Sequence, residues 1–201
     1  MHNEYRLFRD YLPRKIEQQV RRALSACSVV ALIGPRQCGK SILAMAILES
    51  YSDAVRLDLE ERPSDLRKIE NAEYYLEQQS GRLVCLDEIQ RMPELFPLPR
   101  ELVDEYRCPG RHLILGSAFR DLLRQSSDSL AGRVVYHELT PFLIDEVRGR
   151  IDEATLWVRG GYPESLLALD SHDAVLGLSG GGPVMGGVAM EQIIAEFPRC
   201  D

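Results

Sequence analysis

The feature that most constrains the fold of this 201-residue chain is a continuous apolar run, Val29–Ile33, followed by a glycine-bearing loop and a helical segment. Such runs are typical of strands that are buried on both faces of a parallel sheet. The loop Gly34–Ser41 reads GPRQCGKS and matches the pattern GxxxxGK[ST] at every fixed position. The residues that follow, 41–50, have the composition of a helix. A loop of this pattern between a strand and a helix indicates a phosphate-binding loop.

The residue types in this loop suit a nucleoside triphosphate. Its glycines permit a tight turn whose N–H groups point at the phosphates, and the dipole of the following helix favours anions. Lys40 would supply a positive charge to the β- and γ-phosphates, and Ser41 would offer its hydroxyl to Mg²⁺. The alternative is a structural glycine turn. We expect the nucleotide to contact Gly34, Pro35, Arg36, Gln37, Cys38, Gly39, Lys40, Ser41 and Ile42.

Further strands and helices alternate along the chain. Short apolar or alternating segments predict four more strands, over 54–59, 83–86, 112–115 and 134–139. Helical segments are predicted over 13–26, 63–79 (in two pieces around Asn71), 100–106 and 120–125. This alternation predicts an α/β fold of the P-loop type, with a five-stranded, mainly parallel sheet and flanking helices.

The third predicted strand ends in two carboxylates, Asp87 and Glu88. The carboxyl ends of strands are where an open α/β sheet binds ligands. Asp87 would hold Mg²⁺, and Glu88 would orient and deprotonate a water that attacks the γ-phosphate. An acidic pair at a strand end can also be a solvated turn. A hydrolytic glutamate favours nucleotide hydrolysis over phosphoryl transfer to a metabolite.

Three other polar residues are weaker candidates. Ser117 follows the strand 112–115, where a γ-phosphate sensor would lie, but it could equally cap the next helix. Arg133 and Arg159 each stand beside glycine, and an arginine can stabilise the charge on a transferring phosphoryl group. Both could also be ordinary surface arginines. Trp157 is expected in the core.

Composition narrows the function classes. The formal net charge of −7 argues against a chain that coats nucleic acid through bulk charge. Five cysteines without zinc-site spacing indicate reduced thiols and a cytoplasmic protein. No apolar run reaches the length of a membrane span, and we expect no membrane contact. Residues 1–22 carry six Arg or Lys against three acids, so a nucleic-acid contact there is a weak alternative.

Five motifs in order resemble the predicted AAA+ superfamily ATPases of bacteria and archaea. They read GPRQCGKS, LDEIQRMPELF, LILGSAFRDLL, SLAGRVVYHELTPF and LWVRGGYP, and the resemblance covers about residues 8–170. It implies ATP as the nucleotide, with Lys40 and Ser41 as the phosphate-loop pair. It also implies Asp87 and Glu88 as the acidic pair, Ser117 as the sensor and Arg133 as the better arginine-finger candidate.

The resemblance changes near Leu169, where family members continue into a long helical region and a C-terminal domain. Here residues 186–194 resemble the start of that later domain, which suggests a shortened chain. We therefore expect an N-terminal helical segment over 1–26, an ATPase domain over 27–170, and a glycine-rich tail with a remnant of the C-terminal domain over 171–201.

Two functions follow as alternatives. The first is a slow Mg²⁺-dependent ATPase, in which Glu88 activates the water and a homo-oligomer supplies an arginine in trans. The second is a nucleotide-binding switch, or a truncated remnant, that binds ATP without useful hydrolysis. No metal other than Mg²⁺ is expected, because the four histidines show no ligand spacing.

Overall fold

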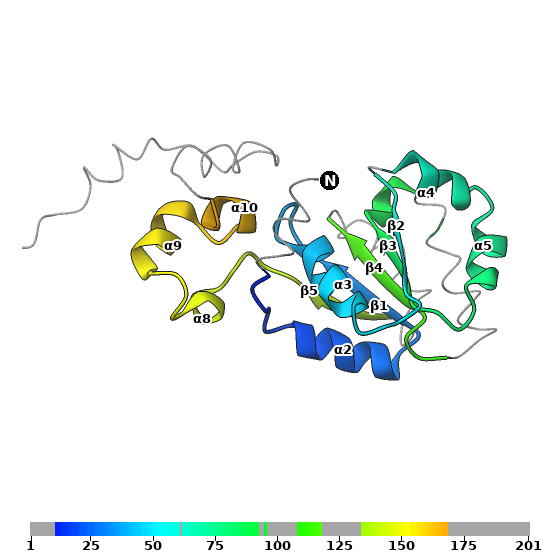
Figure 1. Cartoon of the computed structure of the whole chain (residues 1–201), viewed down its shortest axis with the longest axis horizontal. Helices are drawn as coiled ribbons and strands as arrows, with labels where there is room; N and C mark the ends of the chain where they lie inside the picture. Colours follow the sequence, from blue (N-terminus) through cyan, green and yellow to red (C-terminus); the bar gives the residue numbers. More distant parts are fainter. Residues whose placement is uncertain (1–10, 61, 93–94, 96–107, 118–133, 169–201) are drawn as a thin grey trace, which may run out of the picture.

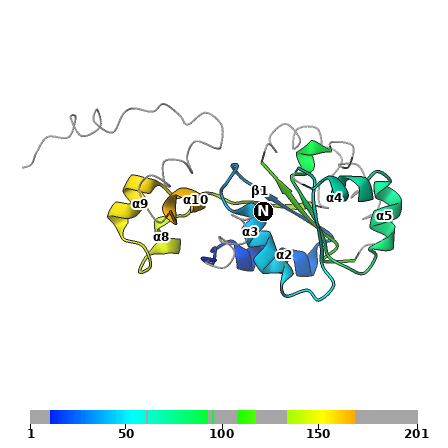
Figure 2. The ribbon, with the colours of Figure 1, turned by 45° about the horizontal axis from the view of Figure 1, so that its top comes forward.

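A parallel sheet lies between two layers of helices, and a third group of helices follows it in the chain (Figures 1 and 2). The computed structural model describes residues 11–60, 62–92, 95, 108–117 and 134–168. Within this part of the chain, no helix has the length and apolarity that crossing a bilayer requires.

The sheet has five strands in the order β2-β3-β4-β1-β5, and all neighbouring pairs are parallel. The strands are β1 (Val29–Ile33), β2 (Val55–Asp58), β3 (Val84–Asp87), β4 (His112–Gly116) and β5 (Val134–Glu138). The α/β prediction of a five-stranded parallel sheet is therefore confirmed. Because the strands are parallel, their carboxyl ends lie together at one edge of the sheet, where they can build a shared site.

The helices are α2 (Glu17–Ala26), α3 (Lys40–Leu48), α4 (Pro63–Lys68), α5 (Ala72–Gln78), the 3₁₀ turn η1 (Ile89–Arg91), α8 (Ile144–Val147), α9 (Glu153–Arg159) and α10 (Pro163–Leu166).

Different helices cover the two faces of the sheet: α2 and α3 pack on one face, and α5 packs on the other. Alternate residues of β1 point to opposite faces, as the pleat of a strand requires. Val30 and Leu32 pack in the cluster with α2 and α3, and Val29 and Ala31 pack in the cluster with α5.

Most element boundaries fall close to the predicted ones. The first helix begins at Glu17 rather than at Pro13, and Arg14 precedes it with a carbonyl that accepts from the Glu17 N–H. The predicted break near Asn71 separates α4 from α5, because the Asn71 side chain accepts a hydrogen bond from the Tyr74 N–H and caps α5.

Helices α8, α9 and α10 lie on the side of the molecule away from α4 and α5 (Figures 1 and 2). They share a small apolar cluster of Phe142, Val147 and Leu166. The expectation that Trp157 is a core residue is wrong: its side chain on α9 is 85% exposed. No residue of α9 is buried, so this short helix offers no core position to a large side chain.

Several predictions lie outside the described residues. These are the helices over 100–106 and 120–125, Arg133, residues 1–10 and the tail 171–201. The proposed domain boundaries therefore stay a prediction.

Candidate functional site

A pocket of 340 Å³ opens at the carboxyl edge of the sheet. It is lined by Arg36, Gln37, Gly39, Lys40, Ser41, Ile42, Arg56, Asp58, Glu60, Asp87, Glu88, Pro163 and Glu164. The loop after β1 and the acidic pair after β3 therefore line the same pocket. The strand β4 lies between β1 and β3 in the sheet and delivers Ser117 to the same edge.

The loop from Gly34 to Ser41 has a tightly constrained backbone. A Cβ on Gly34 would lie 2.1 Å from the carbonyl oxygen of Leu139, so no side chain fits there. Gly39 has φ +98° and Gln37 has φ +62°, the left-handed region that suits glycine best. The Cys38 side chain is buried in the core, and burial raises the pKa of its thiol. The Cys38 side chain is therefore part of the core and not of the pocket lining.

Lys40 begins α3 at the bottom of this loop and is only 4% exposed. Its Nζ donates hydrogen bonds to the carbonyl oxygens of Gly34, at 3.1 Å, and Pro35, at 2.8 Å. These two bonds hold the ammonium group within the curve of the loop. A positive charge is therefore fixed at the place where the loop would enclose an anion.

Asp87, at the end of β3, is buried and paired with an arginine that the sequence analysis did not single out. Arg56 of β2 donates to Asp87 Oδ2 from Nε at 3.2 Å and from Nη2 at 2.7 Å. Burial raises the pKa of Asp87, while Arg56 and the Ser41 hydroxyl act to lower it.

The other carboxylate oxygen of Asp87, Oδ1, is buried and has no hydrogen-bond partner among the described residues. A buried, unsatisfied carboxylate oxygen is costly in an apolar environment. A divalent cation would satisfy it, since carboxylates and hydroxyls are the ligands that Mg²⁺ takes. Asp87 and Ser41 therefore fit the expected metal site.

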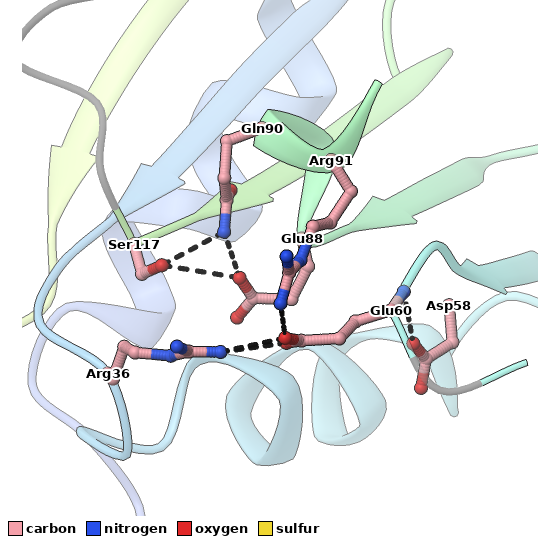
Figure 3. Close-up of polar contacts among 7 residues, drawn as sticks. All are labelled: Arg36, Asp58, Glu60, Glu88, Gln90, Arg91 and Ser117. Carbon is pink, nitrogen blue, oxygen red and sulfur yellow. Dashed lines mark hydrogen bonds and ion pairs between the residues drawn. The ribbon is translucent and has the colours of Figure 1, made fainter. Parts of the chain in front are cut away.

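Glu88 follows Asp87 in an unusual backbone conformation, with φ +56° and ψ +45°. A non-glycine residue in this region is uncommon, and such residues occur disproportionately at functional sites. Its Oε2 accepts hydrogen bonds from Gln90 Nε2 and from the Ser117 hydroxyl, the latter at 3.3 Å. Gln90 Nε2 also donates to Ser117 Oγ at 2.9 Å, which closes a triangle of three side chains (Figure 3).

A second polar cluster lies beside this triangle, and two of its residues, Arg36 and Glu60, line the pocket (Figure 3). Arg36 of the loop donates to both oxygens of Glu60, at 2.9 and 3.0 Å, and Arg91 of η1 pairs with the same carboxylate. The hydrogen bond from Arg91 is the main cause that lowers the pKa of Glu60. Glu60 thereby joins the loop after β1 to the turn after β3. Both arginines are half-exposed, so the pairs add little stability.

The charges that line the pocket suit a nucleotide bound to Mg²⁺ better than a nucleotide alone. The lining holds three cationic side chains, Arg36, Lys40 and Arg56. It also holds five carboxylates, at 58, 60, 87, 88 and 164. The excess of two negative charges equals the charge of one divalent cation. A bare nucleotide would be repelled by the carboxylates, and the complex with Mg²⁺ would be repelled much less.

The pocket lining holds six of the nine predicted loop residues and the acidic pair, but not Gly34, Pro35 or Cys38. Ser117 is outside the lining and bonds to Glu88. Arg159 is not part of the pocket lining: its Nη1 donates to the carbonyl oxygen of Ala168. Arg133 lies outside the described residues. Sequence reasoning missed Arg56, Glu60 and Gln90, because no local sequence pattern marks them and their contacts depend on the folded backbone.

The basic N-terminal segment is partly used inside the fold. Arg14 and Arg21 donate to backbone carbonyls of Cys38 and Ala46, and Lys15 pairs with Asp145. These three side chains are therefore engaged by the protein itself, which weakens the alternative of a nucleic-acid contact there.

Comparison with known proteins agrees with this geometry. The family model described as an AAA domain matches residues 27–148. Two curated relatives, uncharacterised proteins of Mycobacterium bovis and Mycobacterium tuberculosis, are each 41% identical over 161 residues. The match covers 80% of this chain and 36% of each relative, so the chain spans about a third of their length.

A solved structure, the Walker-type ATPase of Pyrococcus abyssi, matches with a TM-score of 0.55 at 18% identity. The match covers 94% of this chain and 75% of that one, and it shows a shared fold. The family model covers more than half of the chain. The chain belongs to the AAA domain family of nucleotide-binding P-loop ATPases.

Proposed function

We propose that this domain binds ATP together with Mg²⁺ and hydrolyses it slowly to ADP and phosphate. The observation that carries the proposal is that the loop ending in Lys40 and Ser41 lines one pocket with Asp87 and Glu88. One bound nucleotide can contact both the phosphate-binding groups and the group that activates water only if they line the same pocket.

The loop and Lys40 would bind the phosphates. Backbone N–H groups of the loop and the N-terminal end of α3 favour an anion, and the Lys40 ammonium would donate to the β- and γ-phosphate oxygens. Ser41 and Asp87 would hold Mg²⁺, which, when bound, neutralises charge on the phosphates. Asp87 Oδ1 would be the atom that contacts the ion, because it has no hydrogen-bond partner among the described residues.

Glu88 is the proposed general base. Gln90 and Ser117 both bond to its Oε2, which fixes the carboxylate in one orientation. Its Oε1 is then the atom we propose to accept a proton from the water that attacks the γ-phosphate. Ser117, predicted as a γ-phosphate sensor, would have to turn its hydroxyl from Glu88 to the phosphate to act as one.

An arginine from a neighbouring subunit would complete the site. The described lining contains Arg36 and Arg56, each already paired with a carboxylate. A homo-oligomer that supplies Arg133 in trans would add the charge stabilisation that an arginine finger gives, a factor of about 10³–10⁵ in rate. Without it, we expect slow turnover.

The test is steady-state ATP hydrolysis of the chain and of Glu88→Gln, over a range of protein concentrations, with MgATP binding measured in parallel. We expect Glu88→Gln to lose turnover and to keep binding, and the turnover per molecule to rise with concentration. Lys40→Ala should weaken binding itself. Wild-type affinity in Lys40→Ala, or lost binding in Glu88→Gln, would contradict the proposed roles.

One observation favours a second function, a nucleotide-binding switch without useful hydrolysis. Glu88 is hydrogen-bonded to both Gln90 and Ser117, and a carboxylate so engaged could be held away from the water. Tight MgATP binding without Glu88-dependent turnover at any protein concentration would favour the switch. Turnover that Glu88→Gln abolishes would favour the ATPase.

A further inference from the structure

Arg14 is bound to the loop from Gly34 to Ser41 by a hydrogen bond and is only 5% exposed. Its Nη1 donates to the carbonyl oxygen of Cys38 at 3.0 Å, in the middle of the loop. Its Nη2 donates to the carbonyl oxygen of Thr140 at 2.6 Å, in the segment that follows β5. One guanidinium group therefore joins two backbone segments that are far apart in the sequence.

The carboxylate of Glu146 holds this guanidinium in place. Arg14 Nε and Nη2 each donate to one oxygen of Glu146, both at 3.2 Å, in a two-pronged pair that is almost fully buried. The N–H groups of Lys15 and Leu143 also donate to Glu146. Together these donors lower the pKa of the Glu146 carboxyl against the opposing effect of burial. Arg14 is thus a fixed cation, since its charge and most of its donors are satisfied.

An aromatic ring completes the surroundings of Arg14. The guanidinium carbon lies 4.3 Å from the centre of the Phe142 ring, a cation–π contact. Phe142 is also a core residue of the α8–α10 cluster. Arg14 therefore contacts the loop on one side and the α8 region on the other.

The hydrogen bond from Arg14 to the Cys38 carbonyl also determines which way the N–H of Gly39 points. In a trans peptide the C=O and N–H bonds point in opposite directions. When Arg14 draws the Cys38 carbonyl to the back of the loop, the N–H of Gly39 is turned to the opposite side. Gly39 lines the pocket, so this N–H belongs to the backbone that would face a bound phosphate.

We propose that Arg14 is a positioning residue for phosphate binding, which orients the Cys38–Gly39 peptide and couples the loop to α8 through Glu146. The inference rests on the proposed function, because it assumes that the loop binds the phosphates of a nucleotide. Arg14 itself touches no nucleotide in this arrangement; it acts through the backbone of the loop. Movement of α8 would then change nucleotide affinity, and nucleotide binding would stabilise α8.

Arg21 offers a matched control from the neighbouring helix α2, which begins three residues after Arg14. It lies in the middle of α2 and donates to the carbonyl oxygens of Ala46 and Ile47, at the C-terminal end of α3. It also pairs with Glu17. Both arginines thus connect the N-terminal segment to α3 or its loop, but only Arg14 reaches the loop.

The experiment compares Arg14→Met, Arg14→Lys and Arg21→Met in the whole chain. MgATP affinity is measured by titration, stability by thermal unfolding, and amide hydrogen exchange is followed over residues 34–41 with and without MgATP. We expect Arg14→Met to weaken MgATP binding about tenfold and to speed exchange in the loop. Arg21→Met should lower the unfolding temperature while leaving affinity and loop exchange at wild-type values.

Arg14→Lys tests the geometry in a variant that keeps the charge. One ammonium group cannot serve Cys38, Thr140 and Glu146 together, so we expect affinity between those of wild type and Arg14→Met, and intermediate loop exchange. Wild-type affinity and wild-type loop exchange in a folded Arg14 variant would overturn the proposal. So would an equal loss of affinity in Arg21→Met.

Failure of the proposed function would look different. If the wild-type chain bound no MgATP, the nucleotide site would be wrong. Exchange over residues 34–41 without ligand would still test Arg14: faster exchange in Arg14→Met than in Arg21→Met supports the positioning role, and equal exchange contradicts it.

Discussion

Arg56 donates two hydrogen bonds to a single oxygen of Asp87, from Nε at 3.2 Å and from Nη2 at 2.7 Å. Both side chains are almost fully buried between β2 and β3. The pair neutralises the carboxylate that we propose as a metal ligand, while Asp87 Oδ1 stays without a hydrogen-bond partner among the described residues. The charge of Asp87 is thus balanced within the fold, and Oδ1 is the oxygen that we propose to bind Mg²⁺.

Loss of the Arg56 guanidinium should destabilise the protein strongly. Arg56→Met leaves a buried carboxylate without its partner, which typically costs about 3 kcal/mol or more in the free energy of unfolding. We expect Mg²⁺ to stabilise this variant more than the wild type, because the cation replaces the lost charge. Urea unfolding with and without Mg²⁺ measures both effects.

Two controls accompany Arg56→Met. Arg82→Met removes an exposed arginine whose bond goes to Gln79, and we expect it to change stability by less than about 0.5 kcal/mol. The double variant Arg56→Met with Asp87→Asn should be more stable than Arg56→Met alone, because Asp87 then carries no buried charge that lacks its arginine. A double variant as unstable as Arg56→Met would show that packing, rather than charge, causes the loss.

The loop from Gly34 to Ser41 and the pair Asp87 and Glu88 could be predicted from the sequence, because each has a local sequence pattern. The loop from Gly34 to Ser41 is recognisable because its function depends on a short run of backbone between a strand and a helix. Asp87 and Glu88 were found because they directly end a buried strand. Arg56 was missed because it reaches Asp87 from a neighbouring strand, and strand order cannot be read from the chain.

Gln90 was missed for a related reason. Its bond to Glu88 depends on the left-handed backbone of Glu88 and on η1, and neither has a pattern in the sequence. Arg14 looked like part of a basic segment, and only the fold places it beside Cys38, Phe142 and Glu146. Tertiary contacts of this kind decide the role of single polar side chains more often than local propensity does.

Removal of the Gln90 amide should slow hydrolysis without weakening binding. Gln90→Leu keeps the size of the side chain but no longer donates to Glu88 and Ser117, so the Glu88 carboxylate loses its fixed orientation. General acid–base catalysis contributes about 10²–10⁴ in rate, and we expect a loss of about tenfold in kcat. Steady-state kinetics and MgATP titration separate kcat from affinity.

The control for Gln90→Leu is Gln78→Leu on the exposed side of α5, which should leave both quantities at wild-type values. A rise in kcat in Gln90→Leu would mean that the hydrogen bond restrains Glu88 rather than positioning it. That outcome would favour the switch function described above.

Acid should destabilise the protein through His112. This side chain lies in the interior of the sheet at the start of β4, and its Nδ1 has no hydrogen-bond partner among the described residues. Burial, with a smaller effect of the Arg111 charge, lowers its pKa from 6.5 to about 4. Between these two pH values the unfolded chain binds a proton that the folded chain does not. Stability therefore falls as the pH drops from 6.5 to about 4, by about 3 kcal/mol from this group.

His112→Leu tests that assignment by removing the titrating group. Urea unfolding of the wild type and of the variant, measured at intervals from pH 7.5 to pH 4.5, should give a flatter pH dependence for the variant. The difference between the two proteins should grow as the pH falls. Parallel curves for the two proteins would show that another group causes the acid sensitivity.

Trp157 is the single tryptophan of the chain and lies largely exposed on α9. We expect its fluorescence emission to lie close to that of tryptophan in water and to be quenched readily by acrylamide. Trp157→Ala should change the free energy of unfolding by less than about 0.5 kcal/mol, whereas removal of a core tryptophan costs about 3–5 kcal/mol. Trp157→Phe is the control that keeps an aromatic side chain. A blue-shifted emission that acrylamide does not quench, with a large loss of stability in Trp157→Ala, would mean that another segment or a second copy of the chain covers this face of α9.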